Sequence, residues 1–200
     1  MLDAPRNTAY DLRRAMNASA KERIGNAVAA MVEDGATVFI SIGTTPAFIA
    51  NALRRRRNLT VVTNNLNAAL ALSEVESNRI ILPGGEVRLP DRDLLGEAAS
   101  AMFTRYRADF GIYGVGGIDA DGALLDFHET EVAAREAIRL NARRAILVAD
   151  RTKFGRLAPI VGGTLHDVDH AVIDARPDTA YAELLQSIGT RLLVAKESAT

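Results

Sequence analysis

Apolar residues occur along this chain in two patterns that alternate. Spacings of three and four, which are typical of amphipathic helices, occur in "SAKERIGNAVAAMVEDG", "NLNAALALSE" and "ETEVAAREAIRLNA", with short β-branched runs between them. The pattern predicts helices near residues 19–34, 46–56, 65–74, 93–106, 129–142 and 178–188. It predicts strands near residues 36–41, 59–63, 79–85, 108–117, 143–150, 170–174 and 191–195.

Strands that alternate with helices in this way are typical of an α/β domain. The segments "VVT", "IIL" and "AILVA" are apolar at consecutive positions, as expected of strands that are covered on both faces. We therefore predict a mostly parallel sheet with helices on both faces. Ligands of such sheets bind beyond the carboxyl ends of the strands.

Residues 1–18 are polar and weakly patterned, so we expect a linker or arm there and a folded domain over residues 19–200. The net charge of −1 argues against strong DNA binding by this chain alone. No apolar run reaches the roughly 20 residues of a membrane helix. The absence of cysteine excludes disulfides and thiolate metal sites, and it fits a reducing compartment such as the cytoplasm.

Small and polar residues follow five of the predicted strands. They are Ser41, Gly43, Thr44 and Thr45 after the first, Thr63, Asn64 and Asn65 after the second, Gly84 and Gly85 after the third, Gly114, Gly116, Gly117 and Asp119 after the fourth, and Asp150, Lys153 and Phe154 after the fifth. A glycine and two hydroxyls at a helix N-terminus are typical of an anion site. Helix capping by the threonines and Asn65, and a surface location of Lys153, are the simpler alternatives.

The sequence lacks the motifs of nucleotide and metal sites. "GVGGID" departs from the dinucleotide fingerprint, no phosphate-binding loop of the Walker type occurs, and His128, His166 and His170 lack ligand-like spacing with carboxylates. "FHETE" places His128 beside Glu129 and Glu131, which suits either acid–base chemistry or, more commonly, a carboxylate-rich helix N-terminus. We expect no metal, no cofactor and no catalytic residue.

Blocks of sequence along nearly the whole chain resemble one protein family. "KERIGNAVAAMVEDGATVFISIGTTPAFIANAL", "LTVVTNNLNAALAL", "ILPGGEVR", "GEAASAMF", "ADFGIYGVGGIDADGALLDFHETEVAAREAI" and "ILVADRTKFGR" occur in order. This succession resembles the C-terminal effector domain of bacterial transcriptional repressors of the DeoR family. "GGIDADGALLDFHETEV" and "DRTKFGR" look most like the subgroup that controls glycerol 3-phosphate metabolism.

The resemblance implies a fold similar to ribose-5-phosphate isomerase and glucosamine-6-phosphate deaminase, used to sense a phosphorylated sugar or polyol. It implies that the phosphate lies on Gly43, Thr44 and Thr45, with Lys153 as cationic partner. The implied pocket also contains Thr63, Asn64, Asn65, Gly84, Gly85, Gly116, Gly117 and Arg135. Arg135 stands where relatives usually carry lysine, and Ser41 stands where many carry an aspartate for ligand hydroxyls.

The resemblance also implies partners. Family members carry an N-terminal winged helix-turn-helix that binds operator DNA, and "PRNTAYDLRR" is similar to the linker that follows it. We therefore expect this chain to be the sensor part of a longer repressor, with glycerol 3-phosphate as the favoured effector. The family implies a homodimer or homotetramer and no contact with membranes.

Two other functions remain open from the residues. An isomerase or deaminase on the same fold would need a carboxylate base near the phosphate, and Glu129, Glu131 and Asp119 are the candidates. A purely structural oligomerisation module would need neither Thr44 nor Lys153. The polar loops without an acid–base pair favour the sensor.

Overall fold

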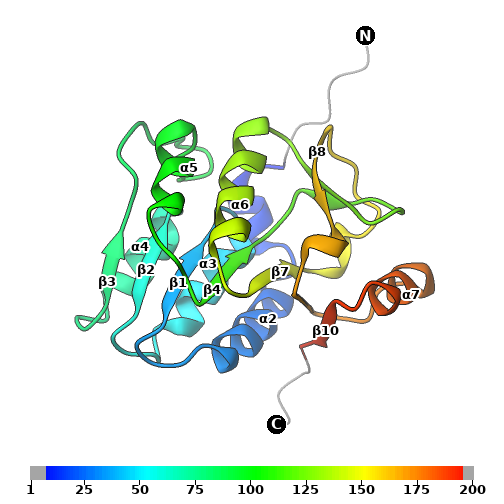
Figure 1. Cartoon of the computed structure of the whole chain (residues 1–200), viewed down its shortest axis with the longest axis horizontal. Coiled ribbons are helices and arrows are strands. Elements are labelled where there is room, and N and C mark those ends of the chain that lie inside the picture. Colours follow the sequence, from blue (N-terminus) through cyan, green and yellow to red (C-terminus); the bar gives the residue numbers. More distant parts are fainter. Residues whose placement is uncertain (1–7, 196–200) are drawn as a thin grey trace.

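Seven parallel strands form the central sheet of the structure, a computed structural model that describes residues 8–195 (Figure 1). In spatial order they are β10 (Arg191–Val194), β9 (His170–Ile173), β7 (Ala145–Ala149), β4 (Phe110–Tyr113), β1 (Thr37–Ile40), β2 (Thr60–Thr63) and β3 (Arg79–Ile81). The predicted parallel sheet is confirmed. Its order places β1 and β4 side by side near the centre.

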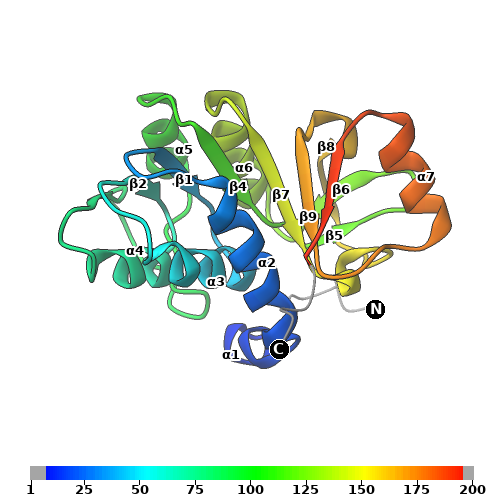
Figure 2. The same ribbon diagram turned by 90° about the horizontal axis from the view of Figure 1, so that it is seen from below.

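Helices cover both faces of this sheet (Figure 2). One face carries α2 (Ala18–Met31), α3 (Thr44–Leu53) and α4 (Leu66–Ser73), and the other carries α5 (Glu97–Thr104) and α6 (Glu129–Asn141). Successive residues of a strand point to opposite faces. Val38 of β1 accordingly packs with the first group of helices, whereas Phe39 packs with the second and meets Phe103 edge to face at 5.2 Å.

A second, antiparallel sheet stands beside the first and was not predicted from the sequence. It contains β5 (Gly117–Ile118), β6 (Ala123–Asp126) and β8 (Ile160–Thr164). The predicted strand over residues 108–117 is therefore divided, because the chain leaves the central sheet after β4 and enters the second sheet at β5. Helix α7 (Thr179–Ser187) packs near this sheet, through Leu185 among other residues.

The predicted linker contains regular structure. Residues 1–7 lie outside the described residues, but Tyr10–Ala15 form helix α1, and α2 begins at Ala18. The side chain of Tyr10 is buried, so α1 rests on the domain. Within residues 8–195, no helix has the length and apolar character needed to cross a membrane.

Candidate functional site

The N-terminus of α3 stands at the carboxyl end of β1. The crossover after β1 leads to β2 on one side, and the chain after β4 returns to β7 on the other, so a crevice is expected between these two strand ends. Gly43 precedes α3 with a φ of 104°, which favours glycine. The first N–H groups of a helix have no partner within the helix, so those of Thr44 and Thr45 are free to bind an anion.

Two adjoining cavities occupy this crevice. One has a volume of about 60 Å³ and the other about 160 Å³, and Arg13, Thr44 and Lys153 line both. Gly114 and Gly116, from the loop after β4, line the first cavity opposite α3. The limited space favours a compact ligand.

Lys153 supplies positive charge to both cavities from the short 3-10 helix η1 (Arg151–Lys153), which follows β7. Burial, and after it the nearby charge of Arg156, lowers the pKa of Lys153 to about 8, while Asp150 opposes both effects. Desolvation and like charges both disfavour an ammonium ion, and a bound anion reverses this. This side of the crevice therefore favours a negatively charged group.

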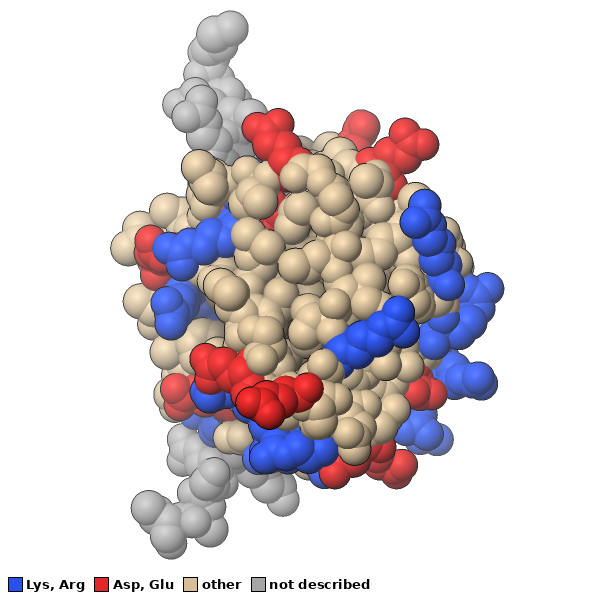
Figure 3. Space-filling model, turned by 90° about the vertical axis from the view of Figure 1, so that its left-hand side faces the viewer, with Lys and Arg blue, Asp and Glu red and all other residues tan. Residues whose placement is uncertain are grey.

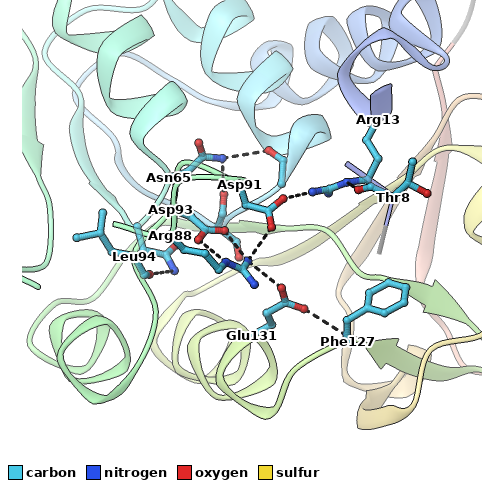
Figure 4. Close-up of polar contacts among 12 residues, drawn as sticks. Thr8, Arg13, Asn65, Arg88, Asp91, Asp93, Leu94, Phe127 and Glu131 are labelled. Carbon is cyan, nitrogen blue, oxygen red and sulfur yellow. Dashed lines mark hydrogen bonds and ion pairs between the residues drawn. The ribbon is translucent and has the colours of Figure 1, made fainter. Parts of the chain in front are cut away.

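A second part of the lining of the first cavity is built around Arg88 (Figure 4). Its guanidinium forms a two-pronged contact with Asp93, at 2.9 Å from Nε and 2.8 Å from Nη2, and also binds Glu131 at 2.9 Å. Burial raises the pKa of the Asp93 carboxyl, and the bonds from Arg88 oppose that shift. Asp91 lies 3.4 Å from the same guanidinium. The cavity thus has a cationic side and a side of paired carboxylates.

Three of the predicted pocket residues, all at the end of β2, form hydrogen bonds with backbone groups around the site. Thr63 donates its hydroxyl to the carbonyl of Ile40 at 2.7 Å. Asn65 caps α4, as its alternative interpretation predicted, by accepting from two backbone N–H groups. Its Nδ2 also donates to the carbonyls of Ser41 and Gly43, both at 3.1 Å. Asn64 donates to the carbonyl of Leu94 at 3.0 Å. None of the three lines either cavity. Thr63 and Asn65 hold the end of β1 and the loop before α3, whereas Asn64 holds the segment at Leu94.

Arg135 is also set back from both cavities. Its side chain is fully buried, and its Nε donates to Asp126 at 3.0 Å. The other oxygen of Asp126 accepts from the backbone N–H of Gly116 at 2.8 Å. Asp126 and Gly116 both line the first cavity. Arg135 therefore reaches the cavity only through Asp126, which fixes the loop after β4.

The remaining predicted glycines lie outside the cavities. Gly84 and Gly85 are exposed in the loop after β3, and an added Cβ at either position would meet no atom within 4 Å. Gly117 begins β5, where a Cβ would collide with the backbone carbonyl of Arg156. The absence of a side chain at Gly117 therefore allows β5 to pack closely against the backbone at Arg156. Of the predicted site residues, the structure brings Gly43, Thr44, Thr45, Gly116 and Lys153 together around the first cavity.

Sequence reasoning missed Arg13, Arg88, Asp93 and Asp126 as lining residues. The charge-rich run "EVRLPDRD" directly after the third strand was a usable signal for Arg88 and Asp93, because it follows a strand end at the ligand-binding edge. No comparable signal marked Arg13, which approaches from α1.

The structure also places the residues considered for acid–base or metal chemistry. Glu129 and His128 are exposed at the start of α6. Glu131 lines the cavity, but one oxygen binds Arg88 and the other accepts from the N–H of Phe127 at 3.2 Å. Across residues 8–195, no group of three His, Cys, Asp or Glu side chains is arranged to hold a metal ion.

Solved structures with a related fold share little sequence with this chain. The eIF2B delta subunit of Chaetomium thermophilum matches with a TM-score of 0.55 and 14% identity, over 94% of this chain and 60% of that one. Ribose 5-phosphate isomerase A of Methanocaldococcus jannaschii matches with a TM-score of 0.49 and 14% identity, over 69% of this chain and 55% of that one. The eIF2B likeness shows the α/β fold.

Sequence relatives are much nearer. The chain is 45% identical to the glycerol-3-phosphate regulon repressor of Escherichia coli K12, over 90% of this chain and 71% of that protein. It is 43% identical to the repressor of the same name in Haemophilus influenzae, over 82% of this chain and 64% of that protein. The repressor CsqR of Escherichia coli K12 is 33% identical over 96% of this chain and 74% of its own length.

A family model described as the DeoR C-terminal sensor domain matches residues 16–175. That range includes the loop before α3, the loop after β4, Arg88 and Lys153, which together surround the first cavity. The chain therefore belongs to the DeoR family, and its residues 16–175 match the sensor domain of that family.

Proposed function

We propose that this chain senses a small phosphorylated polyol, with glycerol 3-phosphate favoured, and thereby controls DNA binding by a transcriptional repressor. One observation carries the proposal: the N–H groups at the start of α3 and the ammonium of Lys153 border the same small cavity. Charge-assisted bonds of this kind bind phosphate strongly. The names of the relatives from Escherichia coli and Haemophilus influenzae support the choice of ligand.

The two sides of the cavity suggest how such a ligand is oriented. The phosphate lies at Thr44, Thr45 and Lys153, and the hydroxyl groups extend toward Arg88 and the carboxylates it pairs with. Ser41 lies outside the lining, and its carbonyl accepts from Asn65. In this proposal the polar cluster around Arg88 recognises the hydroxyls that an aspartate at position 41 would otherwise hold.

We do not assign an enzymatic role to the cavity. A proton-transferring base needs a carboxylate that is free to accept a proton, but both oxygens of Glu131 are engaged and Glu129 is exposed. The relatives are named as repressors. An aldose–ketose conversion assay tests this part, and turnover that is abolished by Glu131→Gln would support the enzyme instead.

The proposal includes operator DNA as a partner, bound in the cytoplasm by a winged helix-turn-helix attached before α1. It also includes a homodimer or homotetramer. The molecular surface on the side of the edge strand β3 offers a broad area without charged side chains (Figure 3). Leu82, directly after β3, is 40% exposed, which suits burial in a subunit contact. Sedimentation of the chain tests the oligomeric state.

Isothermal titration calorimetry with glycerol 3-phosphate tests the ligand assignment. We expect wild-type protein to bind glycerol 3-phosphate and to bind glycerol, which lacks the anion, far more weakly. Lys153→Met should weaken binding by at least about tenfold, since a hydrogen bond to a charged group contributes about 1.5–3 kcal/mol. Arg176→Met removes an exposed cation that lines neither cavity and should leave the affinity unchanged. Absence of binding to the wild type, or equal binding by Lys153→Met, contradicts the proposal.

A further inference from the structure

Helix α1 contributes a cation to the cavity. Arg13 lines both cavities, and its side chain is only 14% exposed although α1 lies at the surface. It forms an ion pair with Asp91, in the loop between β3 and α5, and its Nε donates to the carbonyl of Thr8 at 2.7 Å (Figure 4). Arg13 precedes the range that the family model matches, which begins at residue 16.

Contacts on either side of Arg13 fasten α1 to the domain. Lys21 of α2 donates from its ammonium to the carbonyl of Arg13 and, at 2.8 Å, to that of Met16. The ring of Tyr10 lies near two guanidinium groups, with its centroid 5.6 Å from that of Arg13 and 5.9 Å from that of Arg92. Tyr10 is also buried. The contacts that hold α1 against the domain therefore also place Arg13 in the cavity.

We propose that Arg13 binds the anionic ligand directly and that a bound ligand holds α1 in its docked position. The inference rests on the proposed function, because it concerns the same cavity. A guanidinium has five N–H donors, so Arg13 can keep its contact with Asp91 while donating to a phosphate oxygen.

The direction of the coupling follows from differential affinity. The docked state presents Arg13 to the ligand and the undocked state does not, so the ligand binds the docked state more tightly and increases its population. Coupling is reciprocal, so fastening α1 strengthens ligand binding to the same degree. Because α1 precedes the domain in sequence, any domain attached before it receives this signal. In this proposal, ligand binding at the cavity is coupled to the position of the chain on the N-terminal side of the domain.

The test combines calorimetry with hydrogen–deuterium exchange, using glycerol 3-phosphate as the probe. Arg13→Gln should weaken binding by roughly 10-fold to 100-fold, as expected for one charge-assisted bond. Arg14→Gln removes the same charge from an exposed position of the same helix and should bind as the wild type does. In wild-type protein the ligand should slow exchange of the α1 amides, and in Arg13→Gln it should not.

The outcomes separate this inference from the proposed function. If Arg13 only anchors α1 to Asp91, Arg13→Gln will speed exchange in α1 without ligand but leave the dissociation constant unchanged, which overturns the inference alone. Wild-type binding with no change in α1 exchange overturns the coupling. No binding by wild-type protein overturns the proposed function together with the inference. Arg13→Lys, which keeps the charge but not the fork, should fold normally and bind with intermediate affinity.

Discussion

Lys153 should take up a proton when the anionic ligand binds. In the free protein its pKa is lowered to about 8, chiefly by burial and then by the charge of Arg156, so about half of the molecules carry a neutral Lys153 at pH 8. A phosphate in contact with the amine favours its charged form and returns the pKa toward 10.5, its ordinary value. Ligand binding at pH 8 is therefore coupled to protonation.

The size of the effect follows from the same shift. Restoring the pKa from about 8 to 10.5 corresponds to about 3 kcal/mol of additional interaction with the charged form. At pH 8 the complex should gain about half a proton, and the uptake should approach one proton near pH 9. Affinity should fall by only about twofold between pH 7 and pH 8, and above that it should fall by up to about tenfold per pH unit. A phosphate monoester is already a dianion in this window, so it does not contribute.

Calorimetry in two buffers with different ionisation enthalpies measures this uptake. At pH 8 the apparent binding enthalpy of glycerol 3-phosphate should differ between the buffers in proportion to about half a proton. The difference should disappear in Lys153→Met and persist in Arg176→Met, which changes an exposed cation outside both cavities. Tight binding by the wild type with no buffer dependence at pH 8 would refute the placement of the anion beside Lys153.

Three further changes test the surroundings of the cavity by urea or thermal unfolding. At pH 7 Lys153 is charged in both the folded and the unfolded protein, but burial makes that charge less favourable in the folded protein. Lys153→Met should therefore raise the free energy of unfolding at pH 7 by about 1–3 kcal/mol without ligand. A lower melting temperature would contradict this. Asn65→Ala removes the α4 cap and the support of the loop before α3, so it should cost about 2–3 kcal/mol and weaken ligand binding; unchanged affinity would show that the loop does not need it. Arg135→Met leaves the buried Asp126 carboxylate without its ion-pair partner and should cost about 3–5 kcal/mol, whereas adding Asp126→Asn should recover part of the loss.

The parts of the fold that were predictable from sequence are those in which burial determines the pattern. The strand "AILVA" is apolar at every position because helices cover both of its faces, and all five residues of β7 are buried.

The second sheet escaped prediction because its signals are weak. β5 has two residues, and β8 reads "IVGGT", in which two glycines obscure the apolar run. An added Cβ at Gly162 would collide with Arg135 and would stand 2.6 Å from a methyl carbon of Val132, so this glycine permits close packing over α6. Such a requirement arises from tertiary contact and leaves no local pattern. Strand order is likewise set by long-range pairing.

Part of the cavity lining could be predicted for a related reason. Residues that follow strands in a parallel sheet share one edge, and five residues chosen on that ground line the first cavity: Gly43, Thr44, Thr45, Gly116 and Lys153. The same rule cannot tell a residue that lines the cavity from one that supports it, and Asn65 proved to be a support. Arg13 comes from a helix outside the sheet, so only the folded chain shows its position.

A crystal structure of the chain bound to glycerol 3-phosphate tests the central claim most directly. The account predicts phosphate oxygens within hydrogen-bond distance of the N–H groups of Thr44 and Thr45 and of the Lys153 ammonium, with the hydroxyl groups toward Arg88. A ligand bound elsewhere on the domain, or bound with its hydroxyls on Thr44 and its phosphate among the carboxylates, would contradict it.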